Sequence, residues 1–145
     1  MLDGWKNLET SYERAALGIA VSSEMLTKHF SKKEFACKCR RAECDAKPMS
    51  KVFMQKLETL RLDWGIPLVP TSGARCAYWN EKKDGSPKSQ HLLGNAADFW
   101  FDNTSDLLAF VELAEKHGFG GVGAGSNLVH VDNRKNFARW TYDDK

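Results

Sequence analysis

The sequence predicts a single α+β domain, in which helices pack against a small, mainly antiparallel sheet. The chain has 145 residues, which is enough for one well-packed domain and too few for two ordinary ones. Hydrophobic residues make up 42% and aromatic residues 11%, as expected of a globular protein rather than a disordered one. Helical and strand patterns interleave without a regular βαβ period, and this favours α+β over α/β.

Helical patterns dominate the first half of the chain. Residues 1–25 form a predicted helical extension. The turns that follow carry three apolar anchors: Leu26, Phe30 and Phe35. A firmer helix is predicted over about 49–64, because apolar side chains recur there with a helical period. Pro48 near its start and Gly65 just past its end are typical of helix boundaries.

Strand and loop patterns follow this helix. Residues 66–69 are mostly apolar and precede Pro70 and Gly73, which predicts a short strand ending in a turn. Residues 75–88 are polar, so we expect a long loop there. The sequence AADFWF, residues 96–101, predicts a strand because it combines small and aromatic residues.

The last third of the chain predicts one more helix and two more strands. Thr104 or Ser105 caps the helix, which continues to about Lys116. Glycines within 118–125 predict a flexible connection. The strands after this connection are expected over 128–132 and, at a sheet edge, over 137–142.

The chain contains four cysteines, three of them in the segment CKCRRAEC. They are Cys37, Cys39, Cys44 and Cys76. In a chain matured in the cytoplasm, clustered cysteines indicate thiols or a metal site more than disulfides. A structural zinc ion held by all four is one interpretation. The spacing C-x-C-x4-C is not that of a standard zinc knuckle, so reduced thiols are favoured.

Charge and hydropathy limit the partners of the protein. Between Lys28 and Lys56, nine basic residues stand against three acidic ones, which suits an anionic polymer or is simply a solvated face. Basic and aromatic residues do not interleave there as in nucleic-acid grooves, so no nucleic-acid partner is expected. No stretch approaches the roughly 18 apolar residues of a membrane span, and the first residues do not resemble a secretory signal. We therefore expect a monomer made in the cytoplasm, without stable membrane insertion.

A histidine and an aspartate lie seven residues apart in the stretch SQHLLGNAADFWF. His91 and Asp98 are separated by small residues that allow a tight turn, so the two side chains can face each other. His130, in a predicted strand, adds a second imidazole. Two imidazoles and one carboxylate form a natural ligand set for a catalytic zinc ion, with the fourth position left for water. Zinc in such a site lowers the pKa of water toward about 7.

Several motifs together resemble one family. They are SGAR at 72–75, S-x-H-x-x-G-x-A-x-D at 89–98 and VHVD at 129–132. These motifs resemble those of the zinc D-Ala-D-Ala carboxypeptidases, peptidoglycan peptidases that share a fold with the hedgehog signalling domain. The upstream segment LTKHFSKKEFACKC is similar to the opening of a small phage and bacterial branch, and the resemblance covers roughly residues 26–140. It implies a hedgehog/D,D-peptidase-like single domain.

The resemblance assigns roles to individual residues. It implies that the two histidines and the aspartate described above are the zinc ligands. It implies that Arg75 points into the cleft, where a guanidinium holds a substrate carboxylate or stabilises an oxyanion. Ser89 is implied to hydrogen-bond near the metal or to the peptide, and Gln90 to line the same wall.

One position departs from the family pattern. Several relatives place an acidic residue or a histidine two or three positions before the last zinc-binding histidine, as general base. Leu128 and Asn127 stand there instead. Asp132 shares a strand face with His130, so it either acts as the base or hydrogen-bonds His130 and orients it. A third interpretation makes Asp132 the ligand and His130 the base; we favour His130 as the ligand.

The sequence thus predicts a zinc peptidase spanning residues 1–145. It is expected to hydrolyse peptide bonds in bacterial peptidoglycan stem peptides, as a D,D-carboxypeptidase or an endopeptidase. The expected absence of an export signal is typical of a phage endolysin released through a holin, or of a lysin carried in a virion. The alternatives are a zinc-stabilised binding module without catalysis and a phage structural protein that retains the fold.

Overall fold

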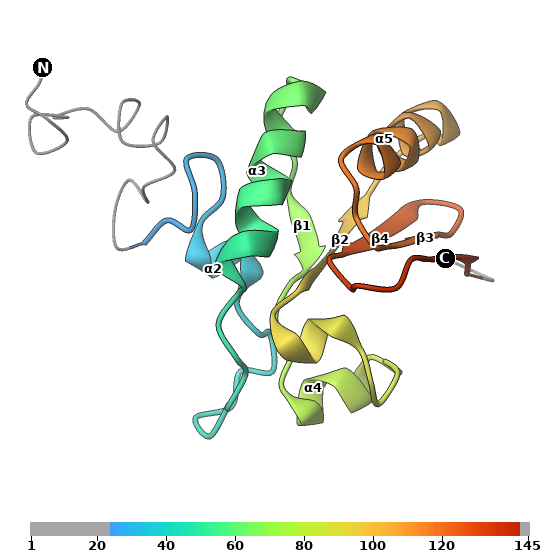
Figure 1. The fold of residues 1–145 in the computed structure, drawn as a ribbon. Coiled ribbons are helices and arrows are strands. Elements are labelled where there is room, and N and C mark those ends of the chain that lie inside the picture. The colour runs from blue at the N-terminus through green and yellow to red at the C-terminus, as the bar shows by residue number, and fades with distance from the viewer. Residues whose placement is uncertain (1–23, 143–145) are drawn as a thin grey trace, which may run out of the picture.

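A computed structural model describes residues 24–142, so the predicted extension over 1–25 lies almost entirely outside the described residues. Five strands form one sheet in the order β1-β2-β4-β3-β5 (Figure 1). The helical elements are α2 (Lys32–Phe35), α3 (Lys51–Trp64), α4 (Ala77–Lys82), the 3-10 helix η1 (Gln90–Leu93) and α5 (Thr104–Lys116). The strands are β1 (Pro70–Ser72), β2 (Ala96–Trp100), β3 (Gly121–Ala124), β4 (Leu128–Asp132) and β5 (Ala138–Thr141).

The sheet confirms the predicted α+β class. Strand β2 pairs antiparallel with β1 and β4, and β4 pairs antiparallel with β3. Only the pairing of β3 with β5 is parallel among the described strands. The predicted strands over 96–101 and 128–132 correspond to β2 and β4, and the predicted edge strand corresponds to β5.

The two faces of the sheet have different chemistry because side chains alternate along each strand. Ala97 and Phe99 of β2 and Val129 and Val131 of β4 belong to the hydrophobic core. The residues between them point to the opposite face, and these include the polar residues Asp98, His130 and Asp132. The fold therefore separates a hydrophobic face from a polar one.

Helices α3 and α5 cover the hydrophobic face. The predicted helix over 49–64 is confirmed as α3, whose buried side chains lie on one stripe: Phe53, Met54, Leu57 and Leu60. On α5, Phe110 is fully buried and its ring lies 4.9 to 5.6 Å from those of Phe101, Phe99 and Trp64. Within residues 24–142, the structure contains no helix with both the length and the apolar character of a membrane span.

The strand predicted over 66–69 is displaced toward the C-terminus. Residues 66–69 are not in a strand, Ile66 and Val69 are exposed, and β1 begins at Pro70. Proline does not prevent this because β1 is an edge strand, where a residue without an amide proton need not break the ladder.

Two further local predictions were wrong. The expected loop over 75–88 contains helix α4, because the sulfur of Cys76 accepts a hydrogen bond from the amide of Trp79 and caps a short helix. Helix α5 is capped by the side chain of Asn103, which accepts from the amide of Asp106, rather than by Thr104 or Ser105. Cysteine and asparagine side chains can cap a helix N-terminus as serine and threonine do, so the sequence alone does not identify the capping residue.

The glycine-rich segment expected to be a flexible connection contains strand β3 instead. A Cβ atom on Gly121 would collide with the carboxylate of Asp132, and one on Gly123 would collide with the ring of Trp140. These glycines are therefore required by close approach of neighbouring side chains within the sheet, and not by flexibility.

The core around Phe110 provides a test of this architecture. We expect Phe110→Ala to lower the free energy of unfolding by about 3–5 kcal/mol, because it leaves a cavity among three aromatic rings. Leu108→Ala on the same helix is the control, since Leu108 is 59% exposed and Phe110 is 0% exposed. Chemical denaturation measures both variants. Equal losses of stability would contradict the packing described here.

Candidate metal centre

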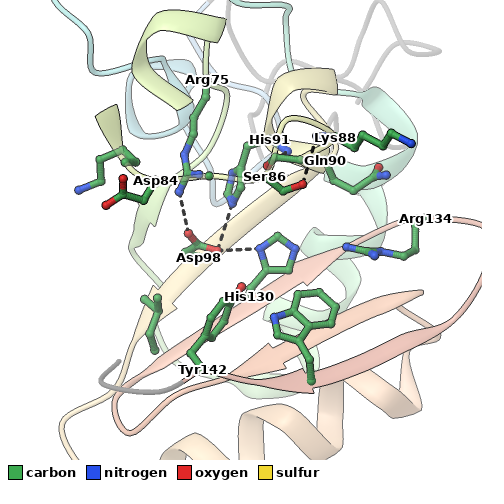
Figure 2. A pocket seen from close by; sticks show the side chains of 15 residues that line it. Arg75, Asp84, Ser86, Lys88, Gln90, His91, Asp98, His130, Arg134 and Tyr142 are labelled. Carbon is green, nitrogen blue, oxygen red and sulfur yellow. Dashed lines mark hydrogen bonds and ion pairs between the residues drawn. The ribbon is translucent and has the colours of Figure 1, made fainter. Parts of the chain in front are cut away.

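The structure brings His91, Asp98 and His130 together on the polar face of the sheet (Figure 2). One ligand atom from each residue lies within 4.8 Å of the other two, and all three residues are buried. Asp98 on β2 is paired directly with His130 on β4. His91 comes from η1, which immediately precedes β2. The predicted trio is thus assembled by one strand pair and one turn of helix.

The orientation of His91 is fixed from outside the trio. Its Nδ1 lies 2.7 Å from the carbonyl oxygen of Gly73. A carbonyl oxygen only accepts hydrogen bonds, so Nδ1 must carry the proton. Nε2 then presents its lone pair and lies 3.2 Å from Oδ1 of Asp98.

His130 is fixed in the same manner by a carboxylate. Its Nε2 lies 2.7 Å from Oδ2 of Asp132, which is fully buried. Arg134 donates to both oxygens of Asp132, at 2.6 to 3.1 Å from its guanidinium. With Asp132 ionised by this pairing, Nε2 of His130 must donate the proton. Its Nδ1 therefore presents a lone pair, 2.9 Å from Oδ1 of Asp98.

Three acceptor atoms therefore converge, and this donor set fits zinc. Imidazole nitrogens and a carboxylate oxygen are typical zinc ligands, and three protein ligands leave one position open. A histidine ligand whose other nitrogen donates to a carboxylate or carbonyl is also typical of zinc sites. The three side chains therefore fit a zinc ion in the number of ligands, in the type of ligand atom and in the direction of each lone pair.

Without a cation, protons must separate these acceptors. Burial alone would raise the pKa of Asp98, but the hydrogen bonds to His130 and His91 outweigh burial and hold that pKa below its usual range. Burial alone would lower the pKa of His130, but its hydrogen bonds to Asp132 and Asp98 raise it. The site therefore favours positive charge at its centre.

A comparison with protein families agrees with this geometry. A family model described as Peptidase M15 matches residues 28–132, which include all three candidate ligands. The chain belongs to the peptidase M15 family. The resemblance to zinc D-Ala-D-Ala carboxypeptidases is confirmed at this level, and M15 peptidases are zinc-dependent. No curated protein matches the chain.

The candidate metal centre opens into a pocket of about 380 Å³. The three candidate ligands line it together with four basic side chains: Arg75, Lys83, Lys88 and Arg134. The pocket-lining residues include two acidic ones, Asp84 and Asp98. The excess of positive charge suits a ligand that carries carboxylates.

The structure places Arg75 at the pocket wall, where it holds Asp98. Its guanidinium donates to Oδ2 of Asp98 at 3.2 Å, to Oγ of Ser72 at 3.0 Å and to Oδ1 of Asn80 at 3.3 Å. Arg75 is buried by these contacts. It lies beside the candidate ligands, but its donors are already directed at Asp98, Ser72 and Asn80.

The two other predicted substrate-binding residues also line the pocket. Oγ of Ser89 accepts from the amide of His91 at 3.1 Å and caps η1. The side chain of Gln90 accepts from the side-chain amide of Asn95 at 2.8 Å. Both residues therefore support the turn that carries His91.

Sequence reasoning missed the contribution of β5 and of Tyr142, which follows it directly. Trp140 lies in the predicted edge strand over 137–142, and its ring lies 5.2 Å from that of His130 and 4.8 Å from the guanidinium carbon of Arg134. Trp140 and Tyr142 both line the pocket. Their spacing of two residues in a predicted strand was the available signal, since such residues share a face.

The positions where relatives carry a base do not supply one here. The side-chain amide of Asn127 donates to the carbonyl oxygen of Phe101 at 2.8 Å. Leu128 lines the pocket with an aliphatic side chain. The departure noted from the sequence is therefore real in the folded protein.

Metal analysis tests the candidate centre. We expect His91→Ala to lower the zinc content of the purified protein by one equivalent per chain, because it removes one of three ligands. His117→Ala is the matched control, since His117 pairs with Asp63 at 2.9 Å. Elemental analysis compares both variants with the wild type. An unchanged zinc content in His91→Ala would exclude this site.

Proposed function

We propose that this M15 peptidase hydrolyses peptide bonds in the stem peptides of bacterial peptidoglycan, with zinc bound by His91, Asp98 and His130. The observation that carries the proposal is the convergence of two imidazole nitrogens and one carboxylate oxygen at an open pocket. Zinc bound there supplies polarisation of a peptide carbonyl and acidification of water. The chain's own residues must then orient the ligands, bind the peptide and move protons.

Arg75 orients one ligand and adds positive charge to the pocket. Its bond to Oδ2 of Asp98 leaves Oδ1 directed at the two histidines. A guanidinium beside the reacting carbonyl also stabilises negative charge that develops on oxygen. We assign Arg75 both tasks, and Ser89 and Gln90 the support of the neighbouring wall.

Asp132 is a positioning residue in this proposal. It is fully buried, accepts from His130 and is paired with Arg134. Burial alone would raise the pKa of Asp132, but hydrogen bonds from His130 and Arg134 outweigh burial and hold it below its usual range. A carboxylate so occupied is a weak proton acceptor, so its role is to orient His130.

Asp84 is our candidate for proton transfer. It lines the pocket, and its carboxylate makes no hydrogen bond or ion pair with another residue in 24–142. A carboxylate that is open to the pocket can take a proton from water and return it to the leaving amine. This assignment supplies a proton acceptor that Asn127 and Leu128 cannot provide.

The charge of the pocket supports peptidoglycan as the substrate class. Stem peptides carry free carboxylates, and the side chains of Lys83 and Lys88 line the pocket and can bind them. Trp140 and Tyr142 add aromatic surface for apolar parts of the peptide. A D,D-carboxypeptidase and an endopeptidase both remain compatible with this lining.

We further propose that the enzyme is a lysin of the phage endolysin or virion-associated type. The segment LTKHFSKKEFACKC, similar to the opening of a phage and bacterial branch, supports this role. Basic side chains of the same region are exposed and suit an acidic cell wall: Lys32, Lys33, Lys38, Arg40 and Lys47.

Digestion of isolated sacculi tests the activity. We expect the wild-type protein to release stem-peptide fragments, and His91→Ala to release none, because hydrolysis requires the metal. Mass spectrometry of the products identifies the bond: loss of a terminal D-alanine marks a carboxypeptidase, and separation of cross-linked peptides marks an endopeptidase. His117→Ala should retain activity. A zinc-loaded wild type that releases nothing from several wall types would instead indicate a binding module.

Measurements of zinc affinity and of kcat can separate the roles of Asp132 and Asp84. We expect Asp132→Asn to weaken zinc binding about 10–100-fold and to recover activity at saturating zinc, because it only orients a ligand. Asp84→Asn should leave zinc binding unchanged and lower kcat by a factor of about 10²–10⁴. Full zinc loading of Asp132→Asn without recovery of kcat would return the role of base to Asp132.

A further inference from the structure

We propose that Cys37, Cys39, Cys44 and Cys76 bind a second, structural zinc ion. Their sulfur atoms all lie within 4.8 Å of one another, and those of Cys37 and Cys76 lie 3.6 Å apart. At a Zn–S distance of about 2.3 Å, tetrahedral geometry places sulfurs about 3.8 Å apart. The four cysteines are thus arranged close to the positions that a four-thiolate site requires.

Folding supplies the fourth ligand of this set. Cys37, Cys39 and Cys44 are close in sequence, but Cys76 is 39 residues beyond Cys37. The backbone brings the two segments together through a hydrogen bond from the amide of Ala74 to the carbonyl of Phe35 at 2.8 Å. Gly73 allows this approach, since a Cβ atom there would lie 2.7 Å from the same carbonyl.

Backbone amides are also directed at the sulfur atoms. The amide of Cys76 donates to the sulfur of Cys37 at 3.3 Å, and that of Arg41 to the sulfur of Cys39 at 3.4 Å. The amide of Trp79 donates to the sulfur of Cys76 at 3.4 Å. Such bonds stabilise negative charge on sulfur and are typical surroundings of metal-bound thiolates.

The chemistry of the set favours a metal ion over a disulfide. A disulfide requires sulfurs about 2.05 Å apart, and the cysteines are all free. Four thiolates in tetrahedral arrangement favour zinc or iron, and all-cysteine zinc sites are structural because no position is left for water. This site therefore differs in kind from the histidine and aspartate site.

The proposed ion would stabilise the backbone behind the catalytic pocket. Cys76 follows Arg75, which holds Asp98, and lies near Gly73, whose carbonyl orients His91. Tying Cys76 to the loop over 37–44 fixes this segment from the side away from the pocket. The cysteine site would thereby keep the ligands of the other site in place without touching substrate.

The test uses full-length protein in which the first site has been removed. We expect the double variant His91→Ala/His130→Ala to retain about one zinc per chain, and X-ray absorption to show four sulfur ligands at about 2.3 Å. Adding Cys44→Ser should remove this zinc. Cys44 is the exposed member of the set, so its replacement perturbs packing least.

Each alternative result overturns the proposal. Absence of zinc from the double variant with its cysteines intact, or a shell of nitrogen and oxygen at about 2.0–2.1 Å, would exclude a four-cysteine site. A disulfide detected by alkylation and mass spectrometry of freshly purified protein would do the same. Because the spectrum is recorded on a protein with all four cysteines, the result does not depend on how Cys44→Ser folds.

Discussion

The candidate metal centre depends on two hydrogen bonds made outside it. Gly73 accepts from one nitrogen of His91, and Asp132 accepts from one nitrogen of His130. Each hydrogen bond keeps a proton on the nitrogen that faces away from Asp98. The nitrogen that faces Asp98 then carries a lone pair and no proton. Asp98 then faces two lone pairs in a buried place, which is unfavourable unless a cation or added protons lie between them. The chemistry of the protein follows from this arrangement.

The sheet and the segment that follows β1 set the geometry of these groups. Antiparallel pairing of β2 with β4 places Asp98 opposite His130, and strand alternation turns Asp132 to the same face. The segment 72–76 supplies the carbonyl that orients His91, the guanidinium that holds Asp98 and one cysteine of the proposed second site. One short segment thus connects ligand orientation, the pocket wall and the N-terminal part of the described fold.

The sequence was most informative where a pattern is local. The apolar period of α3 and the alternation of β4 identified these elements, and motif spacing identified the trio that the fold assembles. The sequence was less informative where contacts between distant parts of the chain determine the structure. Cys76 joins the other cysteines only through tertiary packing, and β3 looks like a loop until Asp132 and Trp140 are seen beside its glycines. The pairing of the fully buried Asp132 with Arg134 could not be predicted either, because two charges close in sequence are usually solvated.

Strand β3 carries no side chain that binds metal or lines the pocket, yet it limits how the protein can evolve. Gly121 and Gly123 leave the space that Asp132 and Trp140 occupy. Almost any replacement of these two glycines adds atoms where the side chains of Asp132 and Trp140 lie, so the site limits which residues are tolerated there. Random mutagenesis of this M15 family member should therefore find Gly121 and Gly123 as restricted as the candidate ligands.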